Sequence, residues 1–128
     1  YYKTTVTPQT DLEIYSSYKH SLFSERVQLI LNITQIQPPN RVLEIGCANG
    51  DFLNRFDKKG FSVAGIEPSE KASKIARDHF GINVKTGVIE SLDLDRFERQ
   101  FDLALSMHTL EHVLNPQLFV SKIAKCVK

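Results

Sequence analysis

The sequence predicts a three-layer α/β domain with a mostly parallel sheet, and three features of its 128 residues support this. Apolar runs typical of buried strands recur along the chain, at 42–45, 61–67, 82–86 and 101–107. Amphipathic helical patterns lie between them, at 51–59 and 70–80. A glycine-containing loop joins the first strand to the first of these helices. Such alternation of strand and helix favours a parallel sheet with helices on both faces.

The loop at 46–50 is the first candidate binding element. The stretch RVLEIGCANGDF runs from a buried strand through Gly46 and Gly50 to the start of a helix. Glycine lets the backbone turn tightly and approach a ligand closely. A strand, a glycine loop and a helix N-terminus together form a nucleotide cradle at the carboxyl end of a parallel sheet. The alternative is an ordinary strand-to-helix turn that contains two glycines.

An acidic residue at the end of the second predicted strand is the second candidate element. Glu67 lies 23 positions after Glu44, the spacing at which a carboxylate holds a ribose diol in nucleotide-binding folds. The alternative is a surface acid beside the next helix, which Ser69 would cap. The motif and its spacing together favour the ribose role.

The spacing of the glycines indicates which nucleotide is bound. Dinucleotide-binding loops have the pattern G-x-G-x-x-G, whose middle glycine lets a pyrophosphate approach the backbone. Here the pattern is G-x-x-x-G, and Ala48 occupies the middle position. This argues against NAD or FAD and for a ligand without pyrophosphate, such as S-adenosylmethionine.

Three segments in order, VLEIGCANGDFL, VAGIEPS and FDLALSMHTLEHVLNP, resemble the motifs of class I S-adenosylmethionine-dependent methyltransferases. The likeness covers residues 41–125, and it is greatest to the small-molecule branch with an LEHV-type signature after strand four. It implies a Rossmann-like fold with strand order 3-2-1-4 and methyl transfer to a small molecule such as a sugar, lipid or natural-product intermediate. The alternatives are a non-catalytic nucleoside-binding or scaffold domain and, more remotely, an NAD-dependent oxidoreductase.

The resemblance also implies the cofactor contacts. Glu44 and Gly46 would hold the methionine end, and Glu67 the ribose. Pro68 and Ile89 would flank adenine. Further contacts are expected at Cys47, Asn49, Gly50, Glu90 and Met107. Members of the family often carry an acid where this chain has Val88. Adenine would therefore be recognised here by backbone groups near Ile89 or by Glu90. The alternative for Glu90, equally well supported, is an acid in the first turn of a helix.

The segment after the fourth strand is expected to face the methyl group. His108 is the candidate general base, with a role as a substrate-facing or capping polar residue as the alternative. Glu111 and His112, expected early in a helix, would shape the substrate pocket. Enzymes of this type that methylate DNA bases or protein glutamine usually show N/D-P-P-Y/F here, and SMHT argues against those substrates.

The same segment, HTLEH, also matches an inverted zinc-protease motif. On a helix, His108 and His112 would share a face and could bind zinc. A third protein ligand, usually a carboxylate, is required, and residues 113–128 contain no Asp or Glu. No metal site is therefore predicted.

Residues 1–40 are predicted to form a helical lead that covers the cofactor. One helix is expected at 11–19, and a second, capped by Ser21, is expected to end before Pro38-Pro39. The resemblance makes Tyr15, Tyr18 and His20 possible lid or substrate contacts. The alternative, favoured by the helical spacing, is that they are aromatic core residues.

Composition sets the remaining expectations. A net charge of +1 with interspersed acids and bases gives no basic stripe for nucleic acid, and no apolar run is long enough to span a membrane. Two cysteines without metal spacing favour a reducing, cytoplasmic setting. Because the family's sheet has further strands, residues 41–128 are expected to be the N-terminal half of a catalytic core in a longer protein. The fourth strand would then be an exposed edge through which a homodimer could form.

Overall fold

The computed structural model describes residues 8–128 and the side chains from residue 13 onward. The chain divides into two compact units, residues 1–35 and 36–128. This boundary lies a few residues before the predicted one at 40/41. Each unit is described by itself.

In its described part, the first unit is a single helix, α1 (Pro8–Thr34). The prediction of two helices with a cap at Ser21 is therefore wrong. No glycine or proline lies between Pro8 and the end of α1, so nothing in the sequence interrupts the helix. Tyr15 and Tyr18 are 63% and 65% exposed, so neither is a core residue.

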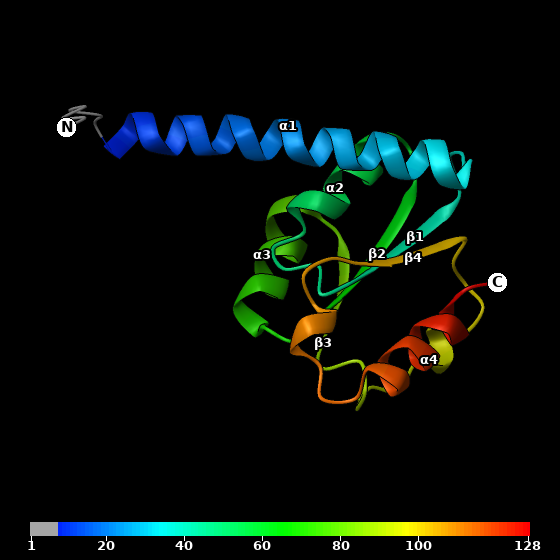
Figure 1. Cartoon of the computed structure of the whole chain (residues 1–128). Coiled ribbons are helices and arrows are strands. Elements are labelled where there is room, and N and C mark those ends of the chain that lie inside the picture. The colour runs from blue at the N-terminus through cyan, green and yellow to red at the C-terminus, as the bar shows by residue number, and fades with distance from the viewer. Residues whose placement is uncertain (1–7) are drawn as a thin grey trace. The chain divides into compact units, whose positions relative to one another are not determined.

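The second unit contains one parallel sheet (Figure 1). Its strands are β1 (Arg41–Ile45), β2 (Ser62–Glu67), β3 (Asn83–Thr86) and β4 (Leu103–Ser106). The strand order is β3-β2-β1-β4 and every pairing is parallel, which confirms the predicted order. The register sets Ile45 opposite Ile66 on one side and Ser106 on the other. As a result, the carboxyl ends of β1, β2 and β4 lie next to one another at the same end of the sheet.

The helices of this unit are α2 (Asp51–Lys58), α3 (Glu70–Phe80) and α4 (Pro116–Cys126). Helices α2 and α3 pack on β2 and β3, and α4 packs by β4 on the other face of the sheet (Figure 1). Ser69 caps α3 by accepting a hydrogen bond from the Ala72 N–H at 3.2 Å, as predicted. Short 3₁₀ turns precede β4 and α4, at Asp95–Phe97 and Leu110–His112.

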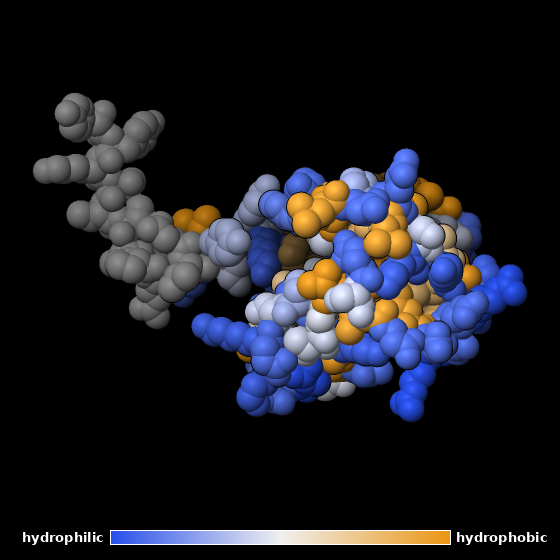
Figure 2. All heavy atoms as spheres, turned by 90° about the horizontal axis from the view of Figure 1, so that it is seen from below, coloured by the Kyte–Doolittle hydropathy of each residue, from blue (hydrophilic) through white to orange (hydrophobic). Residues whose placement is uncertain are grey.

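The surface of the described chain is mixed. Figure 2 shows apolar and hydrophilic side chains interspersed over the face that it presents. Strongly exposed apolar residues occur in the segment from β4 to α4, among them Leu110, Leu114 and Val120. Among the described residues, none of the helices combines the length and apolar character that a membrane crossing requires.

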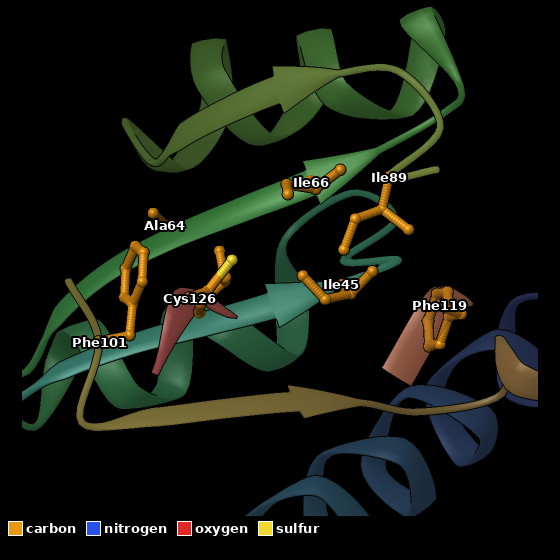
Figure 3. Packing of buried hydrophobic residues seen from close by; sticks show 8 residues of the cluster. Ile45, Ala64, Ile66, Ile89, Phe101, Phe119 and Cys126 are labelled. Carbon is orange, nitrogen blue, oxygen red and sulfur yellow. The ribbon is translucent and has the colours of Figure 1, made fainter. Parts of the chain in front are cut away.

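One cluster of the apolar core lies between the sheet and α4 (Figure 3), and further buried apolar residues, such as Phe52, Leu53 and Phe56 of α2, lie outside it. Alternate residues of β1 and β2 point into it, and α4 contributes Phe119 and Cys126. The members of this cluster are Leu43, Ile45, Ala64, Ile66, Ile89, Phe101, Phe119 and Cys126. The parallel pairing of Ile45 with Ile66 places the bend that follows β1 beside the end of β2.

Candidate functional site

The bend at residues 46–50 connects β1 to α2 and is held by backbone hydrogen bonds. The N–H groups of Gly46 and Cys47 both donate to the Ile66 carbonyl, at 2.7 and 3.2 Å. Gly46, Ala48 and Gly50 have positive φ angles of 77°, 49° and 82°. For Ala48 this conformation costs about 1–2 kcal/mol, because its Cβ crowds the backbone. The bend is therefore a strained turn, fixed to the end of β2.

The two glycines of the bend are required by different neighbours. A Cβ at Gly46 would lie 2.3 Å from Oγ1 of Thr109, a residue that sequence reasoning missed. A Cβ at Gly50 would lie 3.0 Å from the Cβ of Ala76, so Gly50 allows α2 to pack closely on α3. The Asn49 side chain accepts a hydrogen bond from the Asp51 N–H at 3.2 Å, at the start of α2.

Glu67, at the end of β2, points into the bend. Its Oε2 accepts a hydrogen bond from the Ala48 N–H at 2.8 Å, and its Oε1 accepts one from the Ser69 N–H at 2.9 Å. The side chain is buried. The alternative of a surface acid is therefore wrong. The carboxylate connects the glycine bend to the start of α3.

Glu44 is a second buried carboxyl group on the same face of the sheet. It lies opposite Gly65, two residues before Glu67, and it is 3% exposed. Its Oε2 has no hydrogen-bond partner within the described part of the chain. Burial, together with the nearby charge of Glu67, raises the pKa of Glu44 to about 8.

Cys47 packs between these carboxyl groups and α2. A Cβ at Gly65 would lie 2.5 Å from its Sγ, so the missing side chain of Gly65 provides the space for the thiol. Burial, and then the charges of Glu44 and Glu67, raise the pKa of Cys47 to about 12. The thiol is protonated at neutral pH and is a packing group there, not a nucleophile.

A cavity of about 500 Å³ opens beside the bend, where the strands end. Of the predicted site residues, the structure brings five to its lining: Gly46, Pro68, Ile89, Glu90 and His112. Apolar residues that sequence reasoning missed complete the wall, including Val113, Leu114, Leu118 and Phe119. Lys122 of α4 holds one side of the cavity by donating to the backbone carbonyl of Glu90 at 2.6 Å.

The remaining predicted residues lie elsewhere. Met107 and His108 follow β4 and do not line this cavity, and His108 has a positive φ of 56°. The Oε1 of Glu111 lies 3.9 Å from Nδ1 of His108 and 3.9 Å from Nε2 of His112, on the surface. Tyr18 and His20 belong to α1, in the other unit.

The expected helix around Glu111 and His112 is wrong. These residues form a 3₁₀ turn, and α4 begins at Pro116. Asn115 sets that start because its Oδ1 accepts the Leu118 N–H at 3.0 Å, and proline is favoured in the first turn. His108 and His112 therefore do not share a helical face, which removes the geometric basis for the zinc alternative. The Asn-Pro pair is the signal in the sequence that marks this boundary.

The groups at the bend define the ligand chemistry that fits. Two buried carboxyl groups suit hydroxyl donors and positive charge. The adjoining apolar cavity suits a flat ring. S-adenosylmethionine has ribose hydroxyls, two cationic groups and adenine, so the residues present fit it better than NAD.

Comparison with known proteins decides the family. A sequence profile described as a methyltransferase domain matches residues 15–128. The chain belongs to the class I S-adenosylmethionine-dependent methyltransferase family. The methyltransferase profile spans residues from both units, and the glycine bend, both carboxyl groups and the cavity all lie within it.

Individual relatives agree with this assignment. The methyltransferase domain is 37% identical over 91 residues to a ubiquinone biosynthesis O-methyltransferase of Agrobacterium fabrum, covering 69% of this chain and 36% of that protein. The similar enzyme of Maricaulis maris is 32% identical over 93 residues, with the same coverage. The chain thus spans a little over a third of the length of these curated relatives.

Solved structures share the fold. An S-adenosylmethionine-dependent methyltransferase from Mesorhizobium loti superposes with a TM-score of 0.61 at 28% identity, covering 70% of this chain and 42% of that one. A methyltransferase structure from Methanococcus maripaludis gives a TM-score of 0.71 over 91% of this chain and 57% of that one. Its 16% identity makes it evidence for the fold alone.

Proposed function

We propose that this domain binds S-adenosylmethionine and forms the cofactor-binding part of an enzyme that transfers the methyl group to an oxygen atom of a small molecule. The observation that carries the proposal is the buried carboxylate of Glu67, hydrogen-bonded to the glycine bend beside a second buried carboxyl group, Glu44. Oxygen is favoured as the acceptor atom because the curated relatives are named O-methyltransferases. Sugars, lipids and natural-product intermediates remain the proposed acceptor classes.

Glu67 is the proposed ribose contact. Each of its oxygens already accepts one backbone N–H, and a carboxylate oxygen can accept two hydrogen bonds. One acceptor position per oxygen is therefore left for the two ribose hydroxyls. The existing bonds to Ala48 and Ser69 fix the orientation of the carboxylate before the ligand arrives, which lowers the entropic cost of binding.

The other cofactor contacts follow from the same placement. Glu44 and Gly46 are proposed at the methionine end, with Cys47 and Asn49 supporting the bend. Adenine is proposed in the apolar cavity between Pro68 and Ile89, where Glu90 also lies in the wall. Val88 is half exposed and its side chain has no hydrogen-bonding group, so Glu90 is the better side-chain candidate for the adenine amino group.

The chemistry needs positioning more than it needs acid–base groups. A sulfonium methyl is already activated for in-line displacement, so orientation and exclusion of water provide most of the rate. His108 is proposed as the general base that assists some acceptors, and Met107 as a contact near the methyl group. Tyr18, His20, Glu111 and His112 remain proposed substrate contacts.

We also propose that the protein forms a homodimer through the outer edge of β4. A reducing, cytoplasmic compartment is proposed because Cys47 and Cys126 are free thiols.

Calorimetric titration tests the proposal. We expect S-adenosylmethionine and its demethylated product to bind and NAD not to bind. Glu67→Ala should weaken S-adenosylmethionine at least about tenfold, because two hydrogen bonds to a charged acceptor are lost. The matched control is Glu98→Ala, which removes an exposed carboxylate outside the site. Equal binding of NAD, or an unchanged affinity in Glu67→Ala, would contradict the proposal.

A further inference from the structure

The surroundings of Glu44 differ from those of Glu67 in one respect. Both oxygens of Glu67 accept backbone hydrogen bonds, whereas Oε2 of Glu44 is buried without a partner in the described part of the chain. An unpaired charge in such a place is costly. A neutral, protonated carboxyl group costs much less.

No cationic side chain compensates Glu44 from the elements around it in residues 36–128. On β2 the nearest titratable group is Glu67, and in the bend it is Cys47. Its partner on β4 is Leu105, which does not titrate. On α2, the Arg55 guanidinium lies 3.9 Å from Asp51, with which it pairs. The nearby charge is therefore negative, and it belongs to Glu67.

We propose that Glu44 carries a proton in the free domain and releases it to solvent when S-adenosylmethionine binds at the bend, so that cofactor binding is coupled to proton release. The inference rests on the function proposed above. The O–H bond of the Glu44 carboxyl group breaks, the buffer takes the proton, and the carboxylate that remains balances positive charge on the ligand.

The physical basis is the change in the charge that surrounds Glu44. In the free domain, burial and Glu67 raise the pKa of Glu44 to about 8 and so favour the protonated form at pH 7. A bound cation reverses this preference, because an opposite charge within a few ångströms favours the ionised form. The same proton keeps two like charges from facing each other when no ligand is present.

Calorimetry in several buffers measures this release directly. Titrations with S-adenosylmethionine near pH 7, in buffers of different ionisation enthalpy, give the number of protons released as the slope of observed enthalpy against buffer ionisation enthalpy. We expect a release that approaches one proton per ligand for the unaltered protein, because Glu44 is mostly protonated in the free domain. Glu44→Gln should release close to none. Glu98→Gln, the same chemical change at an exposed position, should match the unaltered protein.

The outcomes separate this inference from the proposed function. Binding heat with a slope near zero in the unaltered protein, or an unchanged slope in Glu44→Gln, would overturn proton release while leaving cofactor binding intact. Absence of any binding heat would overturn the proposed function and the inference with it. If Glu44→Gln fails to bind, the affinity of the unaltered protein decides: it should rise with pH between about 6 and 7.5, and a flat profile would overturn the proposal.

Discussion

Neighbouring residues of β1 point to opposite faces of the sheet, and Glu44 has different surroundings from Leu43 and Ile45. Leu43 and Ile45 enter a closely packed apolar cluster beneath α4. Glu44, between them, is equally buried but lies beside a second carboxyl group, and one of its oxygens has no hydrogen-bond partner among the described residues. The first arrangement stabilises the fold, and the second costs stability. A costly polar group kept in a well-packed strand is expected where binding requires it.

A large effect on stability is expected for Leu43, in the buried apolar cluster. Leu43→Ala should reduce the free energy of unfolding by about 2–5 kcal/mol, through lost burial and the cavity left behind. Urea denaturation followed by circular dichroism measures this. Leu118→Ala, at a partly exposed apolar position, is the control and should cost much less. A loss for Leu43→Ala below that of the control would contradict the assignment of Leu43 to the core.

The effect expected at Glu44 depends on pH. Folding raises the pKa of Glu44 from 4.5 to about 8, so the folded state binds the extra proton between these values. The stability contributed by this group is therefore full below about pH 4.5 and is lost as the pH rises to about 8, by up to about 1.4 kcal/mol per unit.

Glu44→Gln removes this titration. Unfolding measured from about pH 5 to pH 8 should show the unaltered protein losing stability relative to the variant as the pH rises. Glu98→Gln controls for charge removal at the surface and should run parallel to the unaltered protein. If the curves for Glu44→Gln and the unaltered protein run parallel, the buried carboxyl group does not titrate as described.

Much of the sheet could be predicted because its signals are local. The apolar run at β1, the glycine bend, Ser69 as a cap and Glu67 at a strand end all depend on neighbours in sequence. The predicted strand order came from the resemblance of three motifs, in their order, to those of one family. The structure confirms this strand order. The position of Glu67 beside the bend follows from parallel pairing, which aligns the ends of β1 and β2.

The features that could not be predicted depend on contacts between distant residues. Thr109 lies over Gly46 although 63 positions separate them, and no local pattern indicates that approach. The apolar wall formed by Leu114 and Leu118 depends on where α4 begins. Asn115 caps α4, which therefore begins at Pro116, later in the chain than the helix expected around Glu111 and His112. That Oε2 of Glu44 has no hydrogen-bond partner in the described part of the chain likewise depends on the packing of the site and not on the sequence of the strand.

A structure of the domain with S-adenosylmethionine bound would show directly whether Glu67 and Glu44 hold the ligand. We expect both ribose hydroxyls to donate to the Glu67 carboxylate and a cationic group of the ligand to lie near Oε2 of Glu44, with adenine between Pro68 and Ile89. A ligand bound elsewhere, or bound at the bend with Glu67 still contacting only Ala48 and Ser69, would contradict it.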